Sequence, residues 1–235
     1  MGRGARRRVN AALVAGCGMA GGAVAVLLPV DVTPSEDGRT VAAGPKRMPA
    51  TVLRTRWGQA MMLATAAVWA ALAASIGASW VLPADLAVAA ALVALTVVDL
   101  RQRLLPRRIV GPAFLLTLAL LGLAAALTND GDALVRALLC AGGAYLGFLV
   151  LRLVNPAALG GGDVTLAVLL GLILGFRSVT AVLIGLALGA ALAAVFALGV
   201  LATRRARPDT ALSYGPFLAA GALVVLLAGP GGLGG

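Results

Sequence analysis

The stretch Pro156–Gly171, PAALGGGDVTLAVLLG, joins a run of three glycines to a single carboxylate and then to an uninterrupted apolar segment. On either side of it, the chain consists of further apolar segments separated by short polar loops. Hydrophobic residues make up 61% of the sequence and charged residues 12%, whereas soluble domains are about half apolar and about a quarter charged. Because the apolar excess forms long runs instead of one-sided stripes, the sequence predicts an integral membrane protein.

The apolar segments predict an all-α, polytopic membrane protein with about seven or eight transmembrane helices. Most of them are near the roughly 20 residues that cross a bilayer as a helix. The segment at 163–176 is shorter, so its ends are expected near the two interfaces or within a protein-lined cavity. The segments fall at about 11–30, 58–77, 80–98, 111–127, 133–151, 163–176, 178–202 and 214–229.

The chain divides into two parts of unequal size. Residues 1–57 are predicted to form an N-terminal anchor helix and a short cytoplasmic loop, and residues 58–235 one membrane-embedded domain. The loop at 31–57 contains no cysteine and is too short for a domain. A basic N-terminal stretch before the first apolar run conflicts with the orientation of the later helices, so the orientation and authenticity of residues 1–47 stay open.

The arginines indicate which side of the membrane faces the cytoplasm. Eight of them lie in three loops that share one side by parity, whereas the opposite loops carry only Arg136 and Arg177. Since Lys and Arg are retained on the cytoplasmic side, the arginine-rich loops are predicted to be cytoplasmic. Acids in or near the outer loops are expected to be solvated loop charges; these are Asp85, Asp130 and Asp132.

Composition excludes several classes of function. The net charge of +10 lies in short loops between apolar segments, where lipid headgroups and orientation account for it, so no nucleic-acid partner is expected. The sequence has no His, and Cys17 and Cys140 lie within apolar runs. No metal site, disulfide framework or His-based triad is therefore expected, and no cofactor is expected. Proton chemistry in this chain would have to use other groups, carboxylates foremost.

Two acids differ from the rest because each adjoins a membrane segment on the predicted cytoplasmic side. Asp99 ends the run VAAALVALTVVD, and Asp163 follows the glycines and begins TLAVLLGLILG. A carboxylate at this depth is costly unless it is paired or hydrated, so it indicates function. Each acid alone also has a structural interpretation: Asp163 could cap its helix, and Asp99 could pair with Arg101 or Arg103.

Together the two acids suggest a defined chemistry. Neighbouring carboxyl groups cannot both ionise cheaply, so the pair shares one proton. The ionised group can then take a proton from water while the protonated group polarises a carbonyl, which hydrolyses a peptide bond without His, Ser or metal. Gly160, Gly161 and Gly162 lack a Cβ, so the backbone there can bend and approach an extended peptide closely.

Three motifs resemble the type IV prepilin peptidases, membrane aspartyl proteases of the GxGD class. VVDLRQRLLPRRIVG (97–111) is similar to the family's first motif, an Asp at a helix end followed by Leu/Ile-Pro, here Leu105–Pro106. GGGD (160–163) is similar to its Gly-x-Gly-Asp motif, and LSYGPFLAAGALV (212–224) to its Gly-Pro-Phe element. The chain departs from the usual family pattern at Thr165 and Arg107, where the family has Lys and Asn or Asp.

The resemblance implies an aspartic-type endopeptidase with Asp99 and Asp163 as catalytic residues. It implies that Gly160, Gly161, Gly162 and Pro106 contact substrate. The substrates would be prepilins or pseudopilins of type IV pilus or protein secretion systems, cut at the cytoplasmic face of a bacterial inner membrane. N-methylation of the product is not carried over, because the family's four-cysteine domain is missing from the loop at 31–57. Oligomeric state and the system served remain open.

Other interpretations of the same residues remain. Acids at membrane depth and glycine-broken helices also occur in small ion- or proton-coupled transporters, although both acids here lie at one interface and not at the midplane. A non-catalytic subunit of a pilus or secretion assembly would keep the fold without needing the acids. Presenilin-type proteases share Gly-x-Gly-Asp, but they normally place Tyr before the first Asp, where this chain has Val98.

Overall fold

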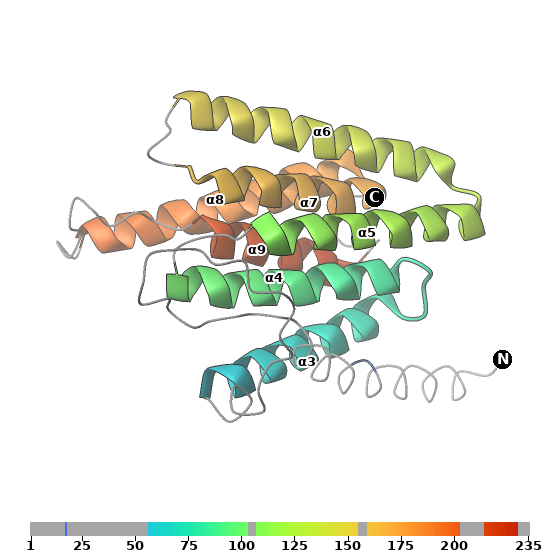
Figure 1. Ribbon diagram of the computed structural model, residues 1–235, viewed down its shortest axis with the longest axis horizontal. Coiled ribbons are helices and arrows are strands. Elements are labelled where there is room, and N and C mark those ends of the chain that lie inside the picture. The colour runs from blue at the N-terminus through green and yellow to red at the C-terminus, as the bar shows by residue number, and fades with distance from the viewer. Residues whose placement is uncertain (1–16, 18–55, 103–106, 155–158, 203–213, 230–235) are drawn as a thin grey trace.

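The computed structural model describes residue 17 and residues 56–102, 107–154, 159–202 and 214–229. Within these residues the chain is all-α, which confirms the predicted fold class, and consecutive helices lie side by side in a bundle (Figure 1). The predicted apolar segment at 11–30 lies outside the described residues except for Cys17. The helices are α3 (Arg56–Ile76), α4 (Leu82–Gln102), α5 (Arg107–Thr128), α6 (Gly131–Val154), α7 (Gly161–Arg177), α8 (Val179–Ala202) and α9 (Gly215–Ala228).

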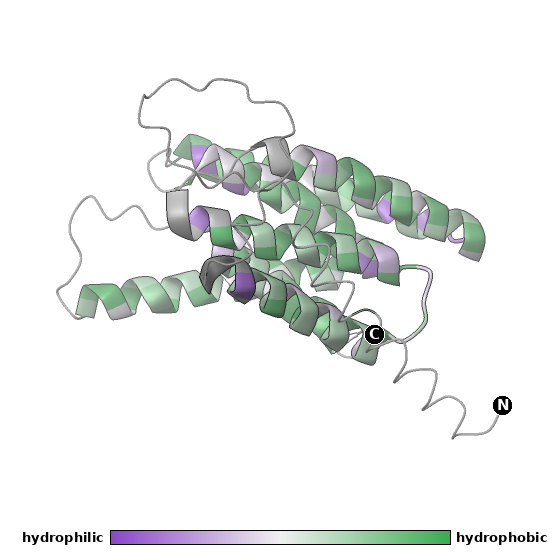
Figure 2. Cartoon of the chain, turned by 60° about the horizontal axis from the view of Figure 1, so that its bottom comes forward, coloured by the Kyte–Doolittle hydropathy of each residue, from purple (hydrophilic) through white to green (hydrophobic). Residues whose placement is uncertain are grey.

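The helices have the length and composition of a membrane bundle. Four of those described are long and apolar enough to cross a membrane, and they contain Gln59–Ile76, Val110–Thr128, Gly131–Val154 and Val179–Ala202. Figure 2 shows apolar residues along the length of the helices. Two more helices carry shorter apolar stretches, Leu82–Val97 and Gly215–Ala228.

Helix α7 lies at the centre of the bundle and packs against α4, α5, α6, α8 and α9. Its side chains are buried around its whole circumference from Leu169 to Phe176, as expected for a helix that is apolar on all sides. With 17 residues it is about 25 Å long, somewhat less than the roughly 30 Å hydrocarbon core of a bilayer. The unpaired backbone N–H and C=O groups at its two ends therefore need hydrogen-bond partners within the protein.

Small residues bring pairs of helices close together, which is the usual way in which helices pack in lipid. A Cβ added at Gly171 of α7 would lie 2.7 Å from the carbonyl oxygen of Cys140, and one at Gly175 would lie 2.5 Å from the Cys140 Cβ. A Cβ at Gly221 of α9 would likewise lie 2.5 Å from the backbone nitrogen of Gly189 on α8. Glycine is thus required where α6 meets α7 and where α8 meets α9.

The order of the helices decides which ends meet. Helix α4 begins at the end of the bundle where α3 ends, and α7 begins at the end where α6 ends, so α4 and α7 run antiparallel (Figure 1). The last turn of α4 and the first turn of α7 consequently share one end of the bundle. We call this the inner end, because it carries the predicted cytoplasmic loops, and the opposite one the outer end.

Candidate functional site

The structure brings the two predicted aspartates together at the inner end. Asp99 lies in the last turn of α4 and is 2% exposed, and Asp163 is the third residue of α7 and is 5% exposed. The two carboxyl groups are close enough for the charge of Asp99 to act on that of Asp163. Two acids separated by more than 60 residues of sequence are thus buried at the same end of the bundle, and we call them the acidic pair.

Local hydrogen bonds hold Asp163 in place. The backbone N–H of Gly160 donates to Asp163 Oδ2 at 3.1 Å, and the backbone N–H of Asp163 donates to the Gly160 carbonyl at 3.2 Å. The carboxylate thereby caps the first turn of α7, where the helix dipole favours an anion. Its other oxygen, Oδ1, is buried and has no hydrogen-bond partner within the described part of the chain. Capping therefore occupies only one of the two carboxylate oxygens.

The three glycines before Asp163 do not form a continuous bend. Gly160 has an extended backbone, with φ −69° and ψ 151°, while Gly161 and Gly162 already belong to the first turn of α7. The requirement for glycine is specific at Gly160, where an added Cβ would lie 3.3 Å from Asp163 Oδ2. The absent side chain at this position leaves room for the carboxylate.

Part of the predicted site lies beyond what the structure describes. Pro106 falls within 103–106, outside the described residues. The side chains of Arg101 and Arg103, the suggested partners of Asp99, also lie outside them.

Asp85 is the residue for which the sequence prediction was wrong. It was expected to be a solvated loop charge, but it lies in the first turn of α4, is 0% exposed and forms a salt bridge with Arg177 of α7. The distance from Arg177 Nη2 to Asp85 Oδ2 is 3.0 Å. A lone acid and a lone base that end apolar runs on the same side of the membrane were the available signal, since such charges seek a partner.

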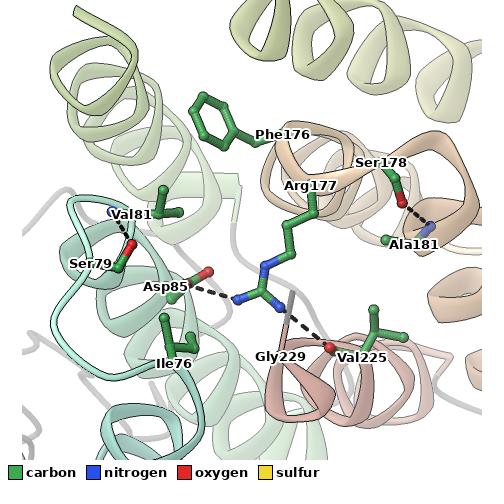
Figure 3. A pocket seen from close by; sticks show the side chains of 10 residues that line it. All are labelled: Ile76, Ser79, Val81, Asp85, Phe176, Arg177, Ser178, Ala181, Val225 and Gly229. Atoms are coloured by element: carbon green, nitrogen blue, oxygen red, sulfur yellow. Dashed lines mark hydrogen bonds and ion pairs between the residues drawn. The ribbon is translucent and has the colours of Figure 1, made fainter. Parts of the chain in front are cut away.

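Arg177 also connects α7 to α9. Its Nη1 donates to the carbonyl oxygens of Val225 at 3.3 Å and Leu226 at 3.0 Å, near the C-terminus of α9 (Figure 3). Figure 3 shows the guanidinium between Asp85 and Val225, at the edge of a cavity of about 210 Å³. This end of the short helix α7 therefore lies in a protein-lined cavity, as its length suggested.

Arg136 of α6 completes the polar layer at the outer end. It donates to the carbonyls of Gly175 at 3.0 Å, Phe176 at 2.7 Å and Arg177 at 3.2 Å, which satisfies the C-terminus of α7. Asp130 and Asp132 are exposed, as predicted, and Asp130 Oδ1 accepts the N–H of Ala133 at the start of α6 at 3.1 Å.

Metal-ligating side chains do not gather in the part of the chain that the structure describes. It contains no group of three or more His, Cys, Asp or Glu residues that could hold an ion.

Comparison with known proteins agrees with the sequence motifs. Searches of the curated proteins and of the solved structures found no match. The model of the type IV leader peptidase family matches residues 86–198, a range that includes Asp99, Gly160–Gly162 and Asp163. The match confirms, over residues 86–198 at the centre of this membrane protein, the resemblance to the type IV prepilin peptidases.

Proposed function

We propose that the chain is an aspartic-type endopeptidase that removes the short leader from type IV prepilins or pseudopilins. The observation that supports this most is the acidic pair. Asp99 and Asp163 lie buried at the same end of the bundle, near enough for their charges to interact, and both fall within the family match. The match to the leader peptidase family suggests the reaction, and the pair supplies groups able to catalyse it.

In the proposed mechanism the two carboxyl groups hold one proton between them. The ionised carboxylate takes a proton from a water molecule, and the water oxygen attacks the scissile carbonyl carbon. The protonated carboxyl group donates a hydrogen bond to the carbonyl oxygen as negative charge develops there. Proton transfer to the amide nitrogen then releases the new amino terminus. Asp163 suits this chemistry because Gly160 orients one oxygen and the other is not bound by a described residue.

Residues 58–235 would form the catalytic domain, with the N-terminal part serving as anchor and loop. Gly160, Gly161 and Gly162 are proposed to contact the substrate backbone, together with Pro106. Gly160 is exposed and lies three residues before the buried Asp163, to which it donates a hydrogen bond, so an extended peptide reaching Gly160 would present its carbonyl beside the acidic pair.

The proposed location is the inner membrane of a bacterium, with the acidic pair on the cytoplasmic side. The arginine-rich loops support this orientation. A prepilin keeps its basic leader in the cytoplasm and its apolar helix in the membrane, so the bond between them lies at the depth of Asp99 and Asp163. Arg107 and Arg108 are proposed to attract an acidic residue just after the cut, and neutralising both is then expected to slow cleavage.

The experiment that tests the proposed function is mass spectrometry of a candidate prepilin from cells with and without this gene. The account requires a product that lacks its leader only when the gene is present. The intact mass of the same product also shows whether its new N-terminus is methylated. Identical prepilin masses in both strains, with the protein present in the membrane of the first, would refute the function.

A further inference from the structure

Two pairs of charged residues connect α4 and α7, one at each end of the bundle. Asp99 follows Asp85 by 14 residues on α4, and Arg177 follows Asp163 by 14 residues on α7. Fourteen residues of an α-helix rise about 21 Å, and their total rotation about the helix axis is within about 40° of four full turns. On each helix the two charged side chains therefore point in similar directions. Because the helices are antiparallel, a contact between Asp85 and Arg177 sets Asp99 level with Asp163.

The outer contact is held more firmly than an isolated ion pair. Arg177 bonds to Asp85 with one nitrogen and to the C-terminal carbonyls of α9 with another. Asp85 lies in the first turn of α4 and Arg177 in the last turn of α7, where each charge is favoured by its own helix dipole. Arg177 thus fixes the end of α7 against α4 and α9.

A buried ion pair contributes little to stability compared with apolar residues of the same size, and setting register is its best-attested role. We infer that Asp85 and Arg177 are positioning residues that fix the axial register of α4 against α7, and so bring the carboxyl groups of Asp99 and Asp163 to the same level. The inference rests on the proposed function. It assigns a role in catalysis to an ion pair four helical turns away from the reacting atoms, at the opposite side of the membrane.

The test compares D85N with R136Q in steady-state cleavage of a purified prepilin by the full-length protein in detergent. Asn is isosteric with Asp but carries no charge, so its attraction for Arg177 is much weaker and α4 is expected to lose its fixed register. We expect kcat to fall about 10- to 100-fold with little change in KM, because misplacement of the catalytic groups by about 1 Å costs that much. R136Q is the matched control: it also removes hydrogen bonds at the end of α7, but among the described residues Arg136 bonds to the carbonyls of α7 and not to α4. Its kcat should stay within about twofold of wild type.

The pH dependence of kcat distinguishes a change in the register of α4 against α7 from a general loss of folded protein. Carboxyl groups that move apart titrate more independently, so the pH range over which kcat stays near its maximum should narrow on both sides in D85N. A variant that is merely less stable has a smaller active fraction and an unchanged profile. If D85N does not reach the membrane, the double variant D85N/R177Q takes its place, because it leaves no buried unpaired charge.

The possible outcomes are distinct. A wild-type protein that does not cleave overturns the proposed function, and this inference with it. A wild-type protein that cleaves, together with D85N or D85N/R177Q of wild-type kcat and pH profile, overturns the inference alone. Equal losses of kcat in D85N and R136Q also overturn it, since they would show that any damage to the outer end has the same effect. A loss of kcat with a narrower pH profile in D85N, absent in R136Q, supports it.

Discussion

Asp163 depends on the residue three positions before it. Gly160 donates its N–H to Asp163 Oδ2, and the lack of a side chain at Gly160 leaves that oxygen its place. An alanine Cβ would lie 3.3 Å from Oδ2, so the carboxylate would have to shift by a few tenths of an ångström. Catalysis by positioned groups is sensitive to shifts of this size.

We therefore expect Gly160→Ala to lower kcat for prepilin cleavage by roughly 3- to 10-fold, and Gly160→Val by more. Abundance in the membrane should not change, because Gly160 is exposed. The matched control is Gly131→Ala, at the first residue of α6, where an added Cβ meets nothing within 4 Å. Full activity in Gly160→Val would show that the position of Oδ2 is not critical.

At the residue scale the sequence was informative about the acidic pair and misleading about Asp85. Asp99 and Asp163 each adjoin an apolar run on the same predicted side, so parity alone placed them at one end. Asp85 looked like a loop acid because it stands close to the predicted start of its segment. Its partner Arg177 is 92 residues away, and no local pattern joins them.

The helices show why the glycines of this sequence are not equivalent. Gly171 of α7 faces the backbone of α6, and a Cβ added at Gly171 would lie 2.7 Å from the Cys140 carbonyl oxygen. Gly143 of α6 points into open space, with nothing within 4 Å. The two glycines look the same in the sequence, but only Gly171 lies where a larger side chain would clash with a neighbouring helix.

Gly171→Ala should destabilise the protein by about 1–3 kcal/mol, because the new methyl group forces α6 and α7 apart. Gly143→Ala should be neutral or slightly stabilising, since alanine favours helix and nothing obstructs it. Thermal unfolding in detergent, followed by circular dichroism, compares the two variants. Equal stabilities would mean that the close contact between α6 and α7 is not maintained.

Helix positions followed from the sequence because long apolar runs leave few alternatives in a membrane. The predicted segments 58–77 and 178–202 correspond to α3 at Arg56–Ile76 and α8 at Val179–Ala202. The central place of α7 did not follow. Its sequence is about as apolar as that of its neighbours, and its burial results from small residues on α7 itself and on the helices that pack against it, which hydropathy does not report.

The whole molecule has two polar ends with different roles. The outer end carries the Asp85–Arg177 salt bridge and the Arg136 cap, and the inner end carries the acidic pair. Arginine counts predict that the inner end faces the cytoplasm. The orientation of the bundle is therefore testable separately from its activity.

In intact cells, a membrane-impermeant maleimide should label Asp130→Cys and not Thr210→Cys, each in a background lacking Cys17 and Cys140. Asp130 is exposed between α5 and α6 at the outer end, and Thr210 stands between α8 and α9 in the sequence, in a segment predicted to be cytoplasmic. Thr210→Cys should become labelled once the cells are opened. The reverse pattern would place the acidic pair outside the cell and remove the cytoplasmic leader as its substrate.

The central claim is that Asp99 and Asp163 together hydrolyse the leader bond, and cleavage of a purified prepilin by Asp99→Asn and Asp163→Asn measures it most directly. Asp132→Asn serves as the control, since Asp132 is exposed at the outer end. We expect each of the first two variants to lose about 10²- to 10⁴-fold or more in rate while remaining folded in the membrane, and the control to cleave as wild type. Cleavage at a near wild-type rate by either Asp99→Asn or Asp163→Asn would contradict the account.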